Sequence, residues 1–446
     1  MNELIKKNYN KIFLFFLYMQ PIIDAIIGIG LNYFNINISI GIIIRMTFLL
    51  FIIYSGVFVY KDRLKSKIIY LVLVLLYIII YVVNILIYKD MNAIIYEIQN
   101  LIKVLYLPCM IICISRINID NKHLIRILTI YSLFIIVPTF LKINLEAYTQ
   151  GKVGSSGFFN SANEISAIFT ILIPILVVYI LNKKWKNKAY LINFIPIFMI
   201  GSKNVILALI LTISITLIYY PVNWYKKRNL DNKNNKIDNS KIIKNIVIAM
   251  AILIVVIIGT ILILPKTSLY KNIVIHLDFL EINTISDVCS YKFINRFIFS
   301  DRLDFLTNTN KNYMNANFIQ KIFGIGYIEN YDTDQETFKL IEMDVFDIFY
   351  RLGIIGFAIF WYPIIEKLKY IVNNRKNIKL EYILSGILIL MLSMFVGHTI
   401  VAPAVSIYIV IILEKCIGNK NMVNHLKYKK SICEEKNENR ICNSKL

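Results

Sequence analysis

Charged residues are scarce in this 446-residue chain, in which Asp, Glu, Lys and Arg together make up 17%. A typical soluble domain carries about 25% of them. Apolar residues make up 57% of the chain, which is too many for an ordinary soluble protein and far too many for a disordered one. This composition predicts a membrane protein with many spans.

Metal-binding and cofactor-binding patterns are also missing. The six cysteines form no CxxC pair, so the sequence indicates neither a structural zinc site nor a disulfide framework, and we expect free thiols. Glycine-rich nucleotide loops and the HExxH zinc pattern are absent. We therefore expect no metal and no cofactor.

The net charge of +21 does not indicate a nucleic-acid partner. The basic residues are not gathered in one solvated stretch but lie between long apolar runs. They instead carry information about membrane orientation. The partner that this pattern predicts is the lipid bilayer, and no nucleic acid is expected.

Apolar runs of about 20 residues are long enough to cross the hydrocarbon core as helices. Twelve such segments are expected, with the pairs within 189–224 and 382–414 the least sharply bounded. They cover residues 12–31, 38–60, 68–88, 101–115, 124–141, 165–181, 189–201, 204–224, 246–265, 343–365, 382–397 and 400–414.

The Lys and Arg distribution predicts the orientation of these spans, because basic residues are enriched in cytoplasmic segments. Most of the 49 Lys and Arg residues fall in connecting segments that share one side with the amino terminus. The predicted topology is therefore even, with both termini cytoplasmic. The domain division that follows is helices 1–9 in 1–265, an extracytoplasmic loop in 266–342, helices 10–12 in 343–414, and a polar cytoplasmic tail in 415–446.

Ionisable side chains within the spans are candidates for function, because each costs about 2.5–3.5 kcal/mol at a helix centre. Asp24 and Arg45 lie at similar depths below the outer surface in adjacent spans, so we expect them to pair. Further candidates lie in the outer halves or at the outer ends of other spans: Lys103, Glu164, Lys203 and Arg351.

The depth of these groups distinguishes two classes of protein. A transporter or flippase places its polar groups near the midplane, often between inverted repeats, whereas this chain gathers them in the outer halves of its spans. We expect a polar, partly cationic cavity that opens toward the outer leaflet. The alternatives are a flippase or transporter of lipid-linked oligosaccharide, and a membrane scaffold without catalysis.

The start of the tenth span carries the densest group of ionisable residues. Asp344, Asp347 and Arg351 are three and four residues apart, which places them on one helix face. Glu342 just precedes them. Helix capping would explain Glu342 and Asp344, but not the deeper Asp347 and Arg351.

The long outer loop carries its own structural signals. Ser300-Asp301-Arg302 predicts an N-cap that opens an amphipathic helix over roughly 301–320. The glycine-rich stretch 323–327 predicts a tight turn. A structured lid over an outer cavity suits an enzyme that binds a large amphiphile. For a phosphate ligand, the available cations are Arg45, Lys103, Arg302 and Arg351.

Several short motifs, in this order and placement, resemble those of the O-antigen ligase/polymerase family of bacterial surface-polysaccharide enzymes. The twelve spans, with a large outer loop between the ninth and tenth, resemble the family's topology. The motifs are Gly157-Phe158-Phe159-Asn160 with Asn163, Glu164 and Ala167; Gly201-Ser202-Lys203-Asn204; Ser300-Asp301-Arg302; Phe323-Gly324-Ile325-Gly326; and Gly353-Ile354-Ile355-Gly356.

The resemblance implies an all-α fold of the GT-C type and a metal-independent glycosyltransferase. Its donor would be a glycan on a polyprenyl diphosphate in the outer leaflet, and its acceptor a second glycan or a lipid-linked glycan. The product would be a capsule, an exopolysaccharide or an O-antigen-like polymer. The implied contacts to diphosphate and glycan come from Arg45, Lys103, Asn163, Glu164, Lys203, Arg302 and Arg351, with Asp24 as a structural partner.

One departure from the family pattern concerns the catalytic base. Ligases of the family commonly place His-Asn where this chain has Glu342-Met343. The candidate catalytic groups are therefore the carboxylates of Glu342, Asp344 and Asp347. The absence of this His favours a polymerase-like variant without deciding between polymerase and ligase.

Overall fold

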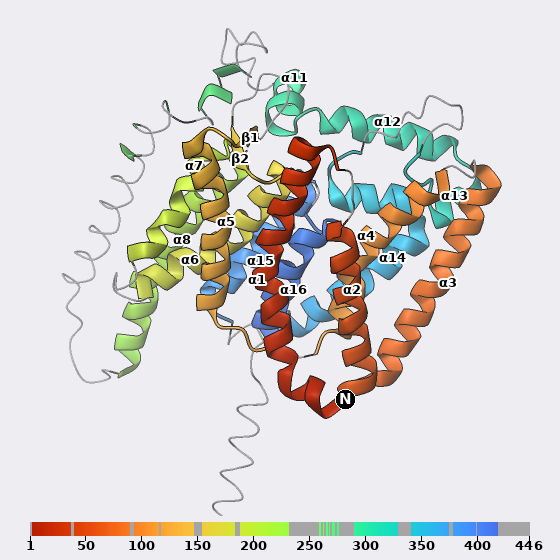
Figure 1. Ribbon diagram of the computed structural model, residues 1–446, viewed down its shortest axis with the longest axis horizontal. Coiled ribbons are helices and arrows are strands. Elements are labelled where there is room, and N and C mark those ends of the chain that lie inside the picture. Colours follow the sequence, from red (N-terminus) through yellow and green to blue (C-terminus); the bar gives the residue numbers. More distant parts are fainter. Residues whose placement is uncertain are drawn as a thin grey trace, which may run out of the picture.

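The structure is a computed structural model, and it is a bundle of helices with one small two-stranded sheet (Figure 1). It confirms the predicted all-α, polytopic membrane fold. The residues that it describes are 2–36, 40–89, 93–115, 117–146, 154–182, 188–231, short stretches between 258 and 275, 290–328, 340–373, 378–397 and 399–417.

The first half of the bundle is made of six long helices and the sheet. The helices are α1 (Asn2–Phe34), α2 (Ile40–Tyr54) with a π-helical turn (Ser55–Val59), α3 (Leu64–Tyr88), α4 (Ala93–Cys113), α5 (Asn121–Leu141) and α6 (Ala162–Asn182). Strands β1 (Leu145–Glu146) and β2 (Ser155–Gly157) pair antiparallel between α5 and α6.

The second half completes the bundle and adds the segment that lies across one end. Its elements are a 3₁₀ helix (Lys188–Phe194), α7 (Ile195–Met199), α8 (Lys203–Asp231), α11 (Tyr291–Phe293) with a π-helical turn (Ile294–Ile298), α12 (Arg302–Asn315), α13 (Phe318–Phe323), α14 (Asp344–Asn373), α15 (Leu380–Phe395) and α16 (Pro403–Ile417).

Ten of the twelve expected spans coincide with long helices, and another, 246–265, lies mostly outside the described residues. Among the described residues, eight helices are long and apolar enough to cross a membrane. The expected span at 189–201 is instead a 3₁₀ helix followed by the short α7. The predicted tail from 415 lies almost wholly outside the described residues.

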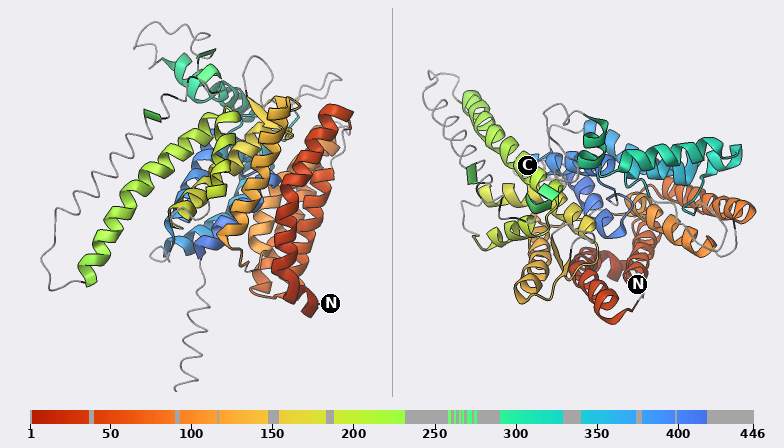
Figure 2. Two further views of the ribbon diagram at one scale, coloured as in Figure 1. Left: turned by 60° about the vertical axis from the view of Figure 1, so that its left-hand side comes forward. Right: turned by 90° about the horizontal axis from the view of Figure 1, so that it is seen from above.

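Burial separates central helices from peripheral ones. Helix α6 is buried along most of its length, and α16 is buried on nearly every side. Helix α3, by contrast, exposes a continuous row of Leu, Ile and Val side chains. With its backbone groups bonded internally, an apolar face of this kind suits contact with lipid chains. Viewed from above, α3 lies at the rim of the bundle and α16 lies near its centre (Figure 2, right).

Helix α12 lies across one end of the bundle, opposite to the end where the amino terminus lies (Figure 1). We call this the α12 end. The helix predicted over 301–320 is therefore present, as α12 and α13. The expected cap is not, because Ser300 and Asp301 both adopt positive φ, and Asp301 forms no side-chain cap bond. A capping side chain requires extended backbone, and the Asp301 carboxylate instead lies 3.5 Å from Arg296 Nε.

Candidate active site

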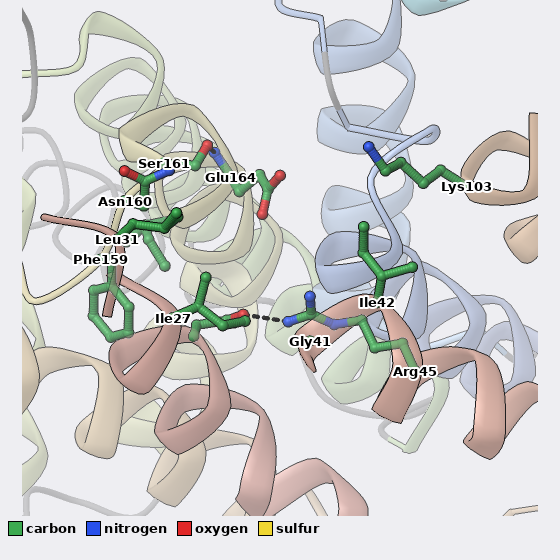
Figure 3. Close-up of a pocket in the computed structure, with 12 residues that line it drawn as sticks. Ile27, Leu31, Gly41, Ile42, Arg45, Lys103, Phe159, Asn160, Ser161 and Glu164 are labelled. Atoms are coloured by element: carbon green, nitrogen blue, oxygen red, sulfur yellow. Dashed lines mark hydrogen bonds and ion pairs between the residues drawn. The ribbon is translucent and has the colours of Figure 1, made fainter. Parts of the chain in front are cut away.

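A pocket of about 320 Å³ lies in the half of the bundle nearer the α12 end. Helices α1, α2 and α4 form its walls together with the start of α6 (Figure 3). Its lining residues are Asp24, Ile27, Leu31, Gly41, Ile42, Arg45, Lys103, Phe159, Asn160, Ser161, Glu164 and Ile165. Four ionisable residues from the sequence prediction thus meet in one cavity. We call it the Arg45 pocket.

The predicted ion pair between Asp24 and Arg45 is confirmed. Arg45 Nη2 donates to Asp24 Oδ1, and Arg45 Nε donates to Gln20 Oε1 at 3.0 Å. The second oxygen of Asp24 accepts a hydrogen bond from the Tyr131 hydroxyl at 3.1 Å. Arg45 is almost fully buried, so the carboxylate compensates a guanidinium that would otherwise be very costly at this depth.

Lys103 and Glu164 project from different walls of the pocket (Figure 3). Among the described residues, no hydrogen bond or ion pair within 4 Å binds the Lys103 ammonium. Asp24 and Gln20 hold Arg45 through its Nη2 and Nε atoms, whereas all the hydrogen-bond donors of Lys103 remain available. Such a group can bind an anionic or hydroxyl-rich ligand.

Close backbone packing shapes the wall formed by residues 155–161. Gly157 has a φ of +65°, and a Cβ there would lie 2.1 Å from the Phe134 carbonyl oxygen. Gly28 on α1 similarly approaches the Phe158 carbonyl. Only glycine fits at both positions, and the resulting turn brings Phe159 and Asn160 into the pocket lining. The Gly157–Asn160 motif therefore acts through its backbone.

Arg302 and Glu342 form a second ion pair, at the α12 end. Arg302 Nη2 lies 2.9 Å from Glu342 Oε2, and Arg302 Nη1 donates to the Phe395 carbonyl at 2.9 Å. The Glu342 side chain is 35% exposed, whereas that of Arg302 is 10% exposed. Glu342 is thus an accessible carboxylate held next to a fixed guanidinium.

Asp344 and Asp347 bind the protein's own backbone. Asp344 Oδ2 accepts hydrogen bonds from the amides of Thr399 and Ile400, both at 2.8 Å. Asp347 Oδ1 accepts one from the Ile341 amide at 3.0 Å. Both side chains are buried. They connect the start of α14 to the loop between α15 and α16 and to the end of the outer loop, and Glu342 remains the exposed carboxylate of the three.

Arg351 lies on the same face of α14 as Asp344 and Asp347, as the spacing predicted, and it is fully buried. Its Nε is 3.9 Å from Asp347 Oδ1, and its Nη1 donates to the Gly326 carbonyl at 3.2 Å. Arg351 therefore contacts the glycine-rich loop after α13, and in this structure it is enclosed by protein.

A buried carboxylate that the sequence reasoning missed holds the same loop. Glu97 accepts hydrogen bonds from the amides of Tyr327 and Ile328 at 2.7–2.9 Å and from the Tyr81 hydroxyl at 2.7 Å. The Lys89 ammonium lies 2.7 Å from Glu97 Oε1, the oxygen that also accepts from both amides. Burial lowers the pKa of Lys89, and the Glu97 carboxylate opposes that shift.

We refer to Lys89, Glu97, Gly326, Tyr327 and Arg351 together as the Glu97 cluster. Glu97 and Lys89 were not among the predicted site residues, because the fourth span was expected to begin at residue 101. Helix α4 begins instead at Ala93. Glu97 thereby fell in an expected connection, where a charged residue needs no explanation. The missed signal was the apolar run that continues on both sides of Glu97.

The same loop is inserted into a break in α14. Gly353 has a φ of +67° and a ψ of −174° inside the helix, and a Cβ there would lie 2.4 Å from the Gly324 amide nitrogen. The amides of Ile325 and Gly326 donate to the carbonyls of Tyr350 and Arg351 at 3.2 Å. Loop amides thus satisfy carbonyls that the interrupted helix leaves without partners.

The remaining candidates lie apart from the lining of the Arg45 pocket. Lys203, the first residue of α8, donates to the Phe297 carbonyl at 2.9 Å and lies 3.8 Å from the centre of the Phe297 ring. It therefore attaches α8 to the segment that precedes α12. Asn163 is partly exposed in the first turn of α6, next to the lining residue Glu164.

The lining of the Arg45 pocket includes four of the residues expected in the single cavity and does not include Arg302, Glu342 or Arg351. Arg45, Lys103, Asp24 and Glu164 line the pocket, while Arg302 pairs with Glu342 beneath α12. Helix α4 connects the two regions, because it supplies Lys103 to the pocket and Glu97 to the cluster. Among the described residues, no group of three or more His, Cys, Asp or Glu side chains is placed to hold a metal ion.

The sequence was compared with models of known protein families. The sequence model described as O-antigen ligase like membrane protein matches residues 6–288 and 289–421. This match covers nearly the whole chain, including every residue of the pocket, the ion pair beneath α12 and the Glu97 cluster. No curated protein matches the chain. The protein belongs to the family of O-antigen ligase like membrane proteins.

Proposed function

We propose that this protein is a membrane glycosyltransferase that transfers or polymerises glycan units carried by a polyprenyl diphosphate. Its family is one of membrane enzymes of surface polysaccharide assembly. In the proposed orientation, which follows from the Lys and Arg distribution, both termini are cytoplasmic and the α12 end faces outward. The product is a capsule, an exopolysaccharide or an O-antigen-like polymer, and the reaction uses no metal.

The observation that carries this proposal is the Arg45 pocket. It lies between four helices that are long and apolar enough to cross the membrane, in the half of the bundle that would adjoin the outer leaflet. A lipid-linked donor in that leaflet has its diphosphate at the membrane surface and its glycan beyond it. A polar pocket at this depth, with Lys103 available to bind oxygen atoms, suits such an amphiphile.

The charges of the pocket suit the leaving group of the proposed reaction. The acceptor hydroxyl oxygen bonds to the first carbon of the donor glycan, and the bond from that carbon to the diphosphate breaks. Negative charge then develops on the departing diphosphate, and fixed cations stabilise it. Lys103 is the cation whose donors are available for this role, while Asp24 and Gln20 hold Arg45 in a fixed orientation.

Glu342 is the proposed base that accepts the proton of the acceptor hydroxyl. It is the most exposed of the three candidate carboxylates, and Arg302 holds it in position by a direct hydrogen bond. A positioned carboxylate of this kind typically contributes about 10²–10⁴-fold to a rate. Asp344 and Asp347, which bind backbone amides, position the segment that carries Glu342.

The lipid-linked glycans of cells that carry Glu342→Gln or Lys103→Met test this proposal. We expect loss of polymer and accumulation of single glycan units on the carrier lipid at the outer surface. Glu366→Gln is the matched control, because its pair with Arg63 is exposed, and this variant should make normal polymer.

Two results would count against the proposal. Unchanged polymer length and yield in both variants, at normal protein levels, would exclude these residues from the reaction. Accumulation of the glycan on the cytoplasmic side would indicate a flippase.

The purified protein distinguishes a polymerase from a ligase. If it joins two carrier-linked units it is a polymerase, and if it transfers the glycan to a different lipid it is a ligase.

A further inference from the structure

Helix α13 belongs to the long loop that the sequence places outside the membrane, yet it packs against α3 below the end of that helix. The Asn84 side chain donates to the Gly324 carbonyl at 3.1 Å, and the Tyr77 hydroxyl donates to the Phe323 carbonyl at 3.2 Å. With a rise of about 1.5 Å per residue, Asn84 and Tyr77 lie about 6 and 16 Å from the last residue of α3, Tyr88. Figure 1 shows α13 beside the upper part of α3, below α12.

The side chains at the start of α13 are exposed and apolar. Phe318 is 76% exposed and Ile319 is 47% exposed, and Met314 at the preceding end of α12 is 61% exposed. Beside them, the last turns of α3 expose Val83, Leu86 and Ile87. Because α13 packs on α3, these side chains extend the apolar surface that α3 presents toward lipid.

Several polar groups at the two ends of α13 have partners within the protein, which favours contact with lipid, since a backbone group without a partner is costly there. At the N-terminus, Asn317 and Gln320 form a capping box, in which each side chain accepts from the other residue's amide. At the C-terminus, the Gln320 carbonyl accepts from the Gly324 amide, and the Lys321 carbonyl accepts from the Tyr313 hydroxyl at 2.9 Å.

The lysine of this segment is bonded to backbone. Lys321 Nζ donates to the Met314 carbonyl at 2.7 Å, which directs the ammonium toward α12. The exposed polar residues of α12 itself, among them Thr307, Asn308 and Lys311, form a separate face. Apolar and polar groups are thus sorted as in a helix that lies in a membrane interface.

We infer that α13 lies in the interfacial region of the membrane, with Phe318, Ile319 and Met314 in contact with the lipids of the leaflet at the α12 end. The partner of this surface is therefore the bilayer itself. The segment joins α12 to the glycine-rich loop, and the inference does not depend on the reaction that the protein performs.

Tryptophan fluorescence in vesicles of brominated phosphatidylcholine tests this inference with the full-length protein. Phe318→Trp adds an indole at the proposed lipid contact, and Asn308→Trp adds one to the exposed polar face of α12 as the matched control. The signal of the parent protein, which has three Trp residues, is subtracted from both. Bromine at two depths in the acyl chain locates the indole.

We expect the Phe318→Trp signal to be quenched several-fold more strongly by brominated lipid than the Asn308→Trp signal, and more by shallow than by deep bromine. Equal quenching of the two variants would overturn the inference. Protection of the new indole from both brominated lipid and aqueous acrylamide would also overturn it, because a protein surface would then cover the site. The Ile319→Trp variant repeats the measurement if Phe318→Trp fails to fold.

Discussion

The Arg45 pocket and the Glu97 cluster both place buried charges in the same half of the bundle, but they differ in what those charges bind. In the cluster, each oxygen of Glu97 is bonded to the protein itself, through two loop amides, one tyrosine and one lysine. In the pocket, Asp24 neutralises Arg45, while the Lys103 ammonium keeps its donors available.

This difference distinguishes a charge that supports the fold from one that is available to a ligand. A carboxylate whose bonds are all internal stabilises the arrangement of its neighbours. Its removal leaves their buried donors without an acceptor, and the full desolvation cost of those donors is then no longer offset. An ammonium without internal bonds contributes little to stability and can bind an incoming group. Depth in the membrane alone, on which the sequence prediction relied, does not separate the two cases.

The largest effect is expected for Glu97→Gln. This change removes the carboxylate charge and leaves Lys89 buried without a counter-charge, which typically costs about 3–5 kcal/mol. Thermal unfolding of the detergent-solubilised protein measures it. Glu366→Gln is the control, because it breaks an exposed pair with Arg63. It should lower the free energy of unfolding by no more than about 1 kcal/mol. If the two changes cost the same, the Glu97 cluster does not hold the fold.

A smaller effect is expected for Gly353→Ala, which tests the break in α14. The positive φ alone costs about 1–3 kcal/mol for a residue with a Cβ, and the contact with the Gly324 amide adds to it. Limited proteolysis of the loop after α13 should accelerate. Gly386→Ala in α15 is the control, because a Cβ there meets nothing within 4 Å. Equal stability of the two variants would contradict the inserted-loop geometry.

The smallest effect on stability is expected for Lys103→Met, within about 0.5 kcal/mol of the parent protein, because within the described part of the chain the ammonium makes no hydrogen bond or ion pair that would be lost. Polymer formation should nonetheless fall, and Lys103→Arg should restore part of it. A variant that unfolds as readily as Glu97→Gln would show that Lys103 supports the fold, and the contrast between pocket and cluster would then fail.

Much of the candidate site was predictable because its residues are unusual for their surroundings. Asp24 and Arg45 interrupt apolar runs at matching depths, and the structure joins them. Arg351 interrupts a run in the same way, yet it is fully enclosed by protein. The sequence could not predict that Arg45 would line a pocket and Arg351 would not. Both are single cations in apolar segments, and they differ only in which chain segments pack around them.

Composition and hydropathy by themselves determined that the chain is an all-α membrane protein, because apolar runs of this length are stable only as spanning helices. They also located the basic segments from which its orientation in the membrane is predicted. Only the tertiary structure decided that Gly353 breaks α14 and that Glu97 serves the loop after α13. These features depend on contacts between different segments of the chain, Gly353 with Gly324 and Glu97 with Tyr327, which no local pattern records.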